Sequence, residues 1–195
     1  MNWLRVVERP FKLGESPFWH GDEHSLYWVD IAGRRLHRCK LPGGTLDSWD
    51  MPSEPGCIAP ARRNGQTAGL VIALRDGVYR ALQWGGVLQR LVGASHDSAK
   101  TRFNDGKADP LGRFWAGTLY EPRDLPAAQL FCMDARGGRS PALECKARNA
   151  TVANGLAWSP DGATLYWTDT TQHLIRAWDW DAASNRMTHE RVFKQ

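Results

Sequence analysis

Apolar and aromatic residues along this chain come in short runs, each closed by glycine, proline, aspartate or asparagine. Runs 78–82, 130–133 and 174–178 have the length and the β-branched or aromatic content of strands. Turn pairs such as Asn64-Gly65 and Asp76-Gly77 recur between such runs. No stretch keeps an apolar period of 3.6 residues, so the pattern predicts an all-β protein with almost no helix.

One segment of this pattern returns without a gap. Residues 15–30 reappear as residues 154–169, and the same offset aligns Trp19 with Trp158. Looser copies start near residues 58 and 104. Starts near 15, 58, 104 and 154 match the length of a four-stranded β-propeller blade, roughly 40–50 residues. We therefore predict that residues 1–195 form a single, incomplete β-propeller domain with about four blades.

The composition is that of an ordinary globular protein, with 42% hydrophobic and 24% charged residues. The four cysteines have neither metal-binding nor redox spacing, which predicts reduced, buried thiols. The net charge is +4, but the basic residues are scattered, and this argues against a nucleic-acid partner. Segment 1–9 lacks the apolar run of a signal peptide, and no run of about 18 apolar residues suits a membrane span. We expect a cytoplasmic protein.

Candidate chemistry lies at the starts of the repeats. The innermost strands of a propeller line its axis, so Glu15, Asn104 (or its neighbour Asp105) and Asn154 are expected to converge there. A ring of carboxylate and amide oxygens suits a hard divalent cation. Asn-Gly and Asp-Gly pairs are also common turn residues, which is the alternative reading. Glu15 favours the metal site, because glutamate has no turn preference.

Other chemistries find little support in the sequence. There is no Gly-x-Ser-x-Gly elbow, and no glycine-rich phosphate loop opens a helix. His20 and His24 flank a predicted turn instead of sharing a helix face, which argues against a zinc site. Asp30 and Asp169 close the repeated Tyr-Trp strands, and we predict that they cap a strand or hydrogen-bond the next turn.

Four motifs carry a resemblance to a known family. They are Gly-Glu-Ser-Pro at 14–17, Arg-Phe-Asn-Asp-Gly-Lys at 102–107, Ala-Gly-Thr at 116–118 and Asn-Gly-Leu-Ala-Trp-Ser at 154–159. Together they resemble the regucalcin/gluconolactonase/luciferin-regenerating enzyme family, over a stretch from about residue 10 to the last residue. The resemblance implies a six-bladed propeller, one divalent metal on the axis (Ca²⁺, Zn²⁺, Mn²⁺ or Mg²⁺) and, in many members, hydrolysis of sugar lactones.

The resemblance also implies roles for particular residues. Glu15 and Asn154 would be metal ligands, and Arg102 and Asn104 would face the substrate. Glu121 lies near the place of a substrate-contacting acid in some members. The family's third ligand, an aspartate that is also the proposed proton-transfer residue, belongs to a further blade that the repeat spacing puts beyond residue 195. No catalytic residue is therefore assigned in this chain.

The function expected from this resemblance is a divalent-metal-dependent sugar lactone hydrolase that opens the lactone ring to the aldonic acid. Two alternatives stay open at this point. One is a calcium-binding regulatory protein with the same fold and little turnover. The other is a truncated, inactive fragment in which four of six blades are present. The expected partner is a small-molecule sugar lactone, without a nucleic acid or a membrane.

Overall fold

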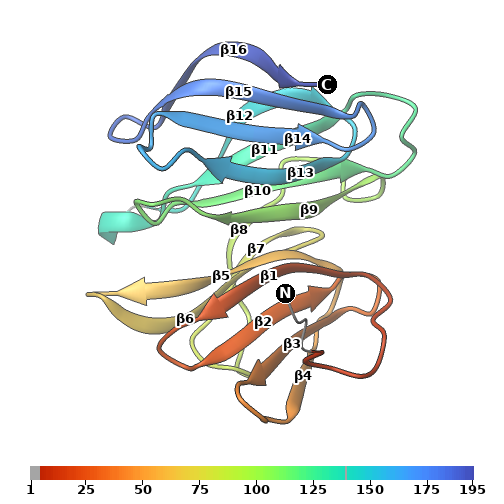
Figure 1. The fold of residues 1–195 in the computed structure, drawn as a ribbon, viewed down its shortest axis with the longest axis vertical. Coiled ribbons are helices and arrows are strands. Elements are labelled where there is room, and N and C mark those ends of the chain that lie inside the picture. Colours follow the sequence, from red (N-terminus) through yellow and green to blue (C-terminus); the bar gives the residue numbers. More distant parts are fainter. Residues whose placement is uncertain (1–4, 139) are drawn as a thin grey trace.

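The computed structural model describes residues 5–138 and 140–195. The sequence prediction that segment 1–9 is not a signal peptide therefore falls partly, at residues 1–4, outside the described residues. Sixteen strands form four antiparallel sheets, each made of four consecutive strands (Figure 1). One three-residue 3-10 turn, Arg136–Gly138, is the only helical element in the described part of the chain. The all-β prediction is confirmed.

The bounds of the strands follow the repeats. The first sheet contains β1 Gly14–His20, β2 Ser25–Asp30, β3 Arg35–Lys40 and β4 Leu46–Asp50. The second contains β5 Pro55–Arg63, β6 Gln66–Leu74, β7 Gly77–Ala81 and β8 Gln89–Gly93. The third contains β9 Thr101–Ala108, β10 Phe114–Tyr120, β11 Ala128–Met133 and β12 Leu143–Ala150. The fourth contains β13 Ala153–Trp158, β14 Thr164–Asp169, β15 Leu174–Asp181 and β16 Arg186–Lys194.

The first strands of the four sheets lie next to one another. Strand β5 contacts β1 and β9, β9 contacts β13, and β1 also contacts β9. Residues 15, 58, 104 and 154, the predicted starts of the repeats, all lie on these four strands. Side chains near the starts of different repeats are thereby brought to one region, although about 40–50 residues of chain separate them.

Each pair of successive sheets is held by its own apolar core. Ile58 and Ile72 of the second sheet pack with Val29 of the first. A second core joins the second and third sheets, and a third, which contains Trp115 and Trp167, joins the third and fourth. Each sheet therefore buries its apolar side chains against its neighbours in the sequence, as expected for a repeat protein.

The repeated aspartates hold the segment that leads into a first strand. Asp30 accepts hydrogen bonds from the backbone N–H groups of Lys12 (3.1 Å), Leu13 (2.8 Å) and Gly33 (3.0 Å). Asp169 does the same in the fourth sheet, for Thr151 (2.8 Å), Val152 (3.2 Å) and Thr171 (3.1 Å). These bonds lower the pKa of Asp30, although burial works in the opposite direction. The predicted structural role of both residues is confirmed.

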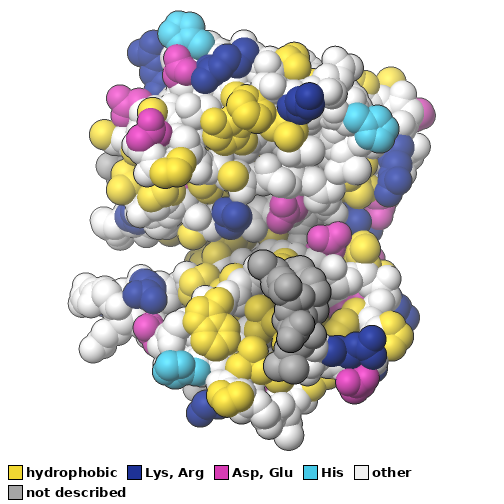
Figure 2. All heavy atoms as spheres, viewed as in Figure 1, with side chains coloured by type: hydrophobic (Ala, Val, Ile, Leu, Met, Phe, Trp, Pro, Cys, Tyr) yellow, Lys and Arg dark blue, Asp and Glu magenta, His cyan; other side chains and the backbone are white. Residues whose placement is uncertain are grey.

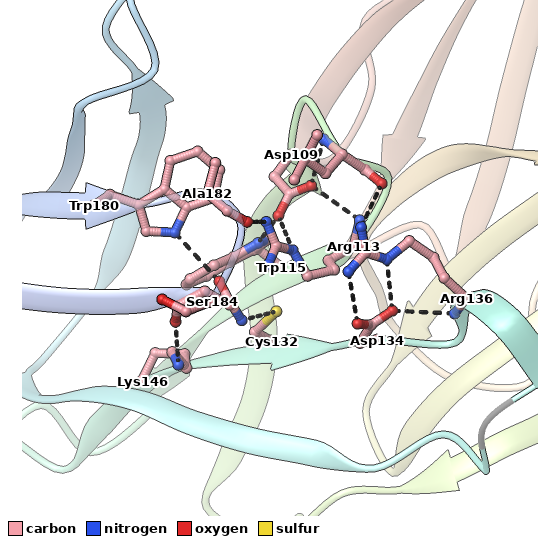
Figure 3. A network of polar contacts seen from close by, with 12 residues as sticks. Asp109, Arg113, Trp115, Cys132, Asp134, Arg136, Lys146, Trp180, Ala182 and Ser184 are labelled. Atoms are coloured by element: carbon pink, nitrogen blue, oxygen red, sulfur yellow. Dashed lines mark hydrogen bonds and ion pairs between the residues drawn. The ribbon is translucent and has the colours of Figure 1, made fainter.

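A buried polar network links the third sheet to the fourth (Figure 3). Asp109 accepts hydrogen bonds from the backbone N–H of Arg113 (3.0 Å), from its Nε (2.6 Å) and from Trp115 Nε1 (3.0 Å). Arg113 Nη2 in turn donates to the carbonyl of Ala182 at 2.7 Å. An ion pair in the third sheet is thereby tied to the β15–β16 turn of the fourth.

Four further expectations concern the chain as a whole. In residues 5–138 and 140–195, no helix has the length and hydropathy needed to cross a membrane. All four cysteines are free thiols; three are buried and Cys145 is partly buried. The cytoplasmic location and the lack of a nucleic-acid partner stay predictions.

Candidate active site

Each of the four first strands carries a β-bulge, which lies near the start of β1, β5 and β13 and in the middle of β9. In β1 the bulge follows Glu15 directly, and in β13 it follows Asn154 at the equivalent point of the repeat. The bulge of β9 takes in Asn104 and Asp105, and that of β5 takes in Gly56. A bulge turns side chains away from the regular alternation of a strand and is frequent beside functional sites. The sequence-predicted residues thus lie at a repeated irregularity.

Three of these residues form one hydrogen-bonded chain. Arg102 Nη1 donates to Asn104 Oδ1 at 2.7 Å. Asn104 Nδ2 donates to the carbonyl of Ala153 at 2.9 Å and to Asn154 Oδ1 at 3.0 Å. Asn154 Nδ2 then donates to Thr170 Oγ1 at 2.7 Å. A backbone carbonyl can only accept, so this contact fixes which end of the Asn104 amide faces Asn154.

Arg102 and Asn104 are nearly closed to solvent, with 8% and 6% of their surface exposed. Burial lowers the pKa of the Arg102 guanidinium, which still has ample margin to stay protonated at neutral pH. A charged donor in such surroundings forms stronger hydrogen bonds than it would in water. The pair therefore offers a rigid, positively charged edge to the site.

Glu15 is subject to opposing influences from its neighbours. Burial raises the pKa of its carboxyl, the nearby Asp105 carboxylate raises it further, and Arg102 lowers it. Asp105 is itself fixed by the backbone N–H groups of Gly106 and Gly155, each at 2.8 Å. Two carboxylates that repel each other form a local negative potential, which a cation would relieve.

Glu121 follows β10 and is held by an arginine from another sheet. Arg75 grips both of its carboxylate oxygens, at 2.7 and 3.0 Å, and also binds Glu54 at 2.9 Å. The hydrogen bonds from Arg75 lower the pKa of Glu121. Arg102 Nε lies 3.9 Å from the same carboxylate. Glu121 therefore lies beside the Arg102 end of the hydrogen-bonded chain.

Sequence reasoning missed Arg75, Glu54 and Thr170. Arg75 precedes the Asp76-Gly77 turn, and the sequence there indicates only a turn. No local pattern points to its partner Glu121, which is 46 residues away. Thr170 directly follows the repeated Asp169, so the repeat could have singled it out. Glu54 has no comparable signal, since it lies in the link between two sheets.

The oxygen donors of the site are of the type that a divalent cation prefers. Glu15 supplies a carboxylate, and Asn154 Oδ1, with one hydrogen bond accepted from Asn104, keeps a second lone pair. These are the hard oxygen donors that such an ion prefers. No group of three His, Cys, Asp or Glu side chains is placed to hold a metal within the described residues. The donor type therefore fits, and water or other oxygens would have to complete the shell.

Four consecutive antiparallel sheets, with carboxylate and amide side chains at the starts of their first strands, define an all-β protein with an oxygen-rich polar site. The sequence profile described as SMP-30/Gluconolactonase/LRE-like region matches residues 13–195. The chain belongs to this family.

Curated relatives and solved structures agree with this assignment. The chain is 41% identical to a 6-deoxy-6-sulfogluconolactonase of Pseudomonas putida, over 87% of this chain and 56% of the relative. It is 33% identical to pentonolactonase XacC of Haloferax volcanii, over 99% and 62%. A calcium-binding protein, regucalcin, from Agrobacterium tumefaciens superposes with a TM-score of 0.86 at 25% identity, over 96% and 61%. The chain thus spans about 56–62% of the length of these proteins.

Proposed function

We propose that this chain belongs to a divalent-metal-dependent sugar lactone hydrolase, which adds water to the lactone and opens the ring to the aldonic acid. The observation that carries the proposal is the hydrogen-bonded chain from Arg102 through Asn104 to Asn154, with Glu15 nearby. Two relatives named as lactonases, at 41% and 33% identity, support the same reaction class.

The four sheets are, in this proposal, four blades of a six-bladed β-propeller. Support comes from the consecutive antiparallel order of the strands and from the contacts among the first strands of the sheets. The chain's span of about three fifths of its relatives' length is compatible with four blades of six. In a propeller these first strands line the axis, where a small ligand reaches side chains from several blades.

The side chains divide into two groups by charge and position. Glu15 and Asn154 would hold the cation, which when bound polarises the lactone carbonyl and stabilises negative charge that develops on its oxygen. Arg102 would donate hydrogen bonds to the oxygens of the sugar ring. Both N–H groups of Asn104 are already engaged, so Asn104 would face the substrate through the second lone pair of its Oδ1 and accept a hydrogen bond from a sugar hydroxyl. Glu121, fixed by Arg75, would accept a hydrogen bond from a sugar hydroxyl. The residue that moves the proton is not assigned within this chain.

Asn104 has a second role in this scheme. Its Nδ2 donates to Asn154 Oδ1, so it orients the remaining lone pair of that oxygen. Loss of a supporting hydrogen bond of this kind typically weakens metal affinity by about 10–100-fold. Loss of Asn104 would therefore weaken both substrate positioning and metal binding.

The test measures metal binding and turnover separately. Calorimetric titration with Ca²⁺, Mn²⁺, Zn²⁺ and Mg²⁺ reports affinity, and a pH-indicator assay follows acid release from a panel of sugar lactones with and without EDTA. The full-length Pseudomonas putida relative serves as a positive control for the assay. Glu15→Gln should weaken metal binding at least tenfold. The matched control is Glu144→Gln, an exposed glutamate on β12 paired with Lys146.

A second candidate function is a calcium-binding protein with little turnover. It rests on the similarity to the regucalcin structure from Agrobacterium tumefaciens. Tight Ca²⁺ binding without acid release from any lactone would favour it. Metal affinity that is the same for Glu15→Gln and the unaltered chain would contradict both candidates.

A further inference from the structure

A groove of about 750 Å³ opens between the second and third sheets. Cross-strand neighbours form its two walls, since directly paired residues of antiparallel strands point to the same face. The wall residues are Ala59, Val71 and Arg80 on the second sheet and Ala108, Phe114 and Met133 on the third. A notch is visible between the two halves of the molecule at the left of Figure 2, beside the β5–β6 hairpin.

The groove is the continuation of a closed apolar core. The neighbouring row on the second sheet consists of Cys57, Ala73 and Val78, which are completely buried against the third sheet. In the next row of the second sheet, which contains Val71, the second and third sheets separate. Val71 and Leu91 are therefore only partly buried. The walls therefore leave apolar surface open to a ligand.

Arg80 is the unusual residue of this wall. It occupies the place where the preceding row has the apolar Val78, and its Nη2 donates to the Gln89 side chain at 2.8 Å. Its Nε is buried without a hydrogen-bond partner, and no carboxylate of the described residues lies within ion-pair distance of it. A guanidinium beside apolar surface, with neither a counter-charge nor a full set of acceptors, attracts an anion.

The other charged groups along the groove are already engaged. Arg62 and Arg136 each have an aspartate partner, at 3.3 and 2.8 Å. Asp109 also lines the groove, but its fully buried carboxylate binds Arg113 at 2.6 Å. Among the residues that the structure describes, Arg80 is therefore the cation of the groove whose charge a ligand would balance.

The groove is separate from the candidate active site. Ala108 ends β9, whereas Arg102 lies near its start and Asn104 in its middle. Six residues of extended strand separate Arg102 from Ala108, which corresponds to about 20 Å. The Arg102 end of the candidate site is therefore separated from the groove by almost the whole length of the strand.

We propose that this groove binds an amphipathic organic anion. The apolar body of the ligand packs between Val71 on one wall and Phe114 and Met133 on the other. Its single carboxylate or sulfonate group accepts hydrogen bonds from Arg80. The site is independent of the lactonase proposal and would exist whether or not the chain hydrolyses lactones.

The test uses a pair of fluorescent probes that differ in charge. The anionic probe is 8-anilinonaphthalene-1-sulfonate, and the neutral probe is N-phenyl-1-naphthylamine, which has the same rings without the sulfonate. Titrations compare the unaltered chain with Arg80→Gln and Arg80→Lys. The matched control is Arg90→Gln, which removes an exposed arginine of the adjacent strand β8 that does not line the groove.

Arg80→Gln should weaken binding of the anionic probe about tenfold, the usual effect of losing a charge-assisted hydrogen bond. It should leave the neutral probe within about twofold. Arg80→Lys, which keeps the charge, should retain most of the affinity, and Arg90→Gln should bind both probes as the unaltered chain does. Equal affinity of Arg80→Gln and the unaltered chain for the sulfonate overturns the proposal. Equal losses for the two probes, or the same loss in Arg90→Gln, also overturn it.

Discussion

Removal of the buried carboxylate of Asp109 is the sharpest test of how the third and fourth sheets are joined. In Asp109→Ala, Arg113 becomes a buried cation without a counter-ion, and Trp115 Nε1 loses its acceptor (Figure 3). The side chains of the ion pair are 0% and 1% exposed, so water cannot replace the lost partner. The expected loss in free energy of unfolding is about 3–5 kcal/mol.

A matched ion pair isolates the effect of burial. Arg35 Nε and Asp50 Oδ1 are also 2.6 Å apart, but Asp50 is 81% exposed. Because solvent screens an exposed pair, Asp50→Ala should leave stability almost unchanged. Asp109→Asn should fall between the two variants, since it keeps the shape and part of the hydrogen bonding but removes the charge.

Urea unfolding followed by tryptophan fluorescence and by circular dichroism measures these differences. With a slope of about 1–3 kcal/mol per M, Asp109→Ala should lower the midpoint by at least about 1 M. Coincidence of the two signals checks that unfolding is two-state. If Asp109→Ala does not accumulate as folded protein, the comparison of Asp109→Asn with Asp50→Ala gives the same contrast. A loss for Asp109→Ala no larger than for Asp50→Ala would refute the reasoning.

Three further predictions concern single positions. Burial and a neighbouring carboxylate raise the pKa of Glu15, so on acidification metal affinity should begin to fall at a higher pH than it would with an ordinary glutamate ligand. Calorimetry between pH 4 and 7 checks this, and Glu15→Gln should abolish the pH dependence. Burial raises the pKa of the Cys57 thiol well above its usual value, so iodoacetamide at about pH 8 should leave Cys57 unmodified until the protein unfolds. Mass spectrometry of the peptides measures the labelling, and labelling in the native state would contradict the buried position of Cys57. Gly56→Ala would put a Cβ 2.4 Å from the Phe103 carbonyl and should lower the free energy of unfolding in urea by about 1–3 kcal/mol. Gly21→Ala, whose Cβ would have nothing within 4 Å, should leave it unchanged, and equal effects of the two substitutions would argue against the contact.

Much of the fold follows from local sequence signals. The alternation of apolar and polar residues and the turn residues act over a few positions. The segment at Glu15 that recurs 139 residues later at Asn154 forms the same strand and bulge in β1 and β13. The roles of Asp30 and Asp169 could be predicted for the same reason, since each bonds backbone groups at fixed offsets in its repeat. The site was predicted only as a set of positions at the starts of repeats.

The contacts that define the site and the groove could not be predicted in this way. Arg75 meets Glu121, and Asn104 meets Asn154, because strand register and packing between sheets bring together side chains 46 and 50 residues apart. The position of Arg80 opposite Val71 likewise depends on the pairing of β6 with β7.

The sequence by itself determined the strands, the turns and the repeated starts of the sheets, because these depend on backbone preferences and side-chain alternation within a few residues. Only the tertiary structure decided which charges are paired and which remain open. Arg113 is neutralised in a closed core, whereas Arg80 faces a groove and has no carboxylate of the described residues within ion-pair distance. That difference arises from how closely successive sheets pack at each row, which no local pattern encodes.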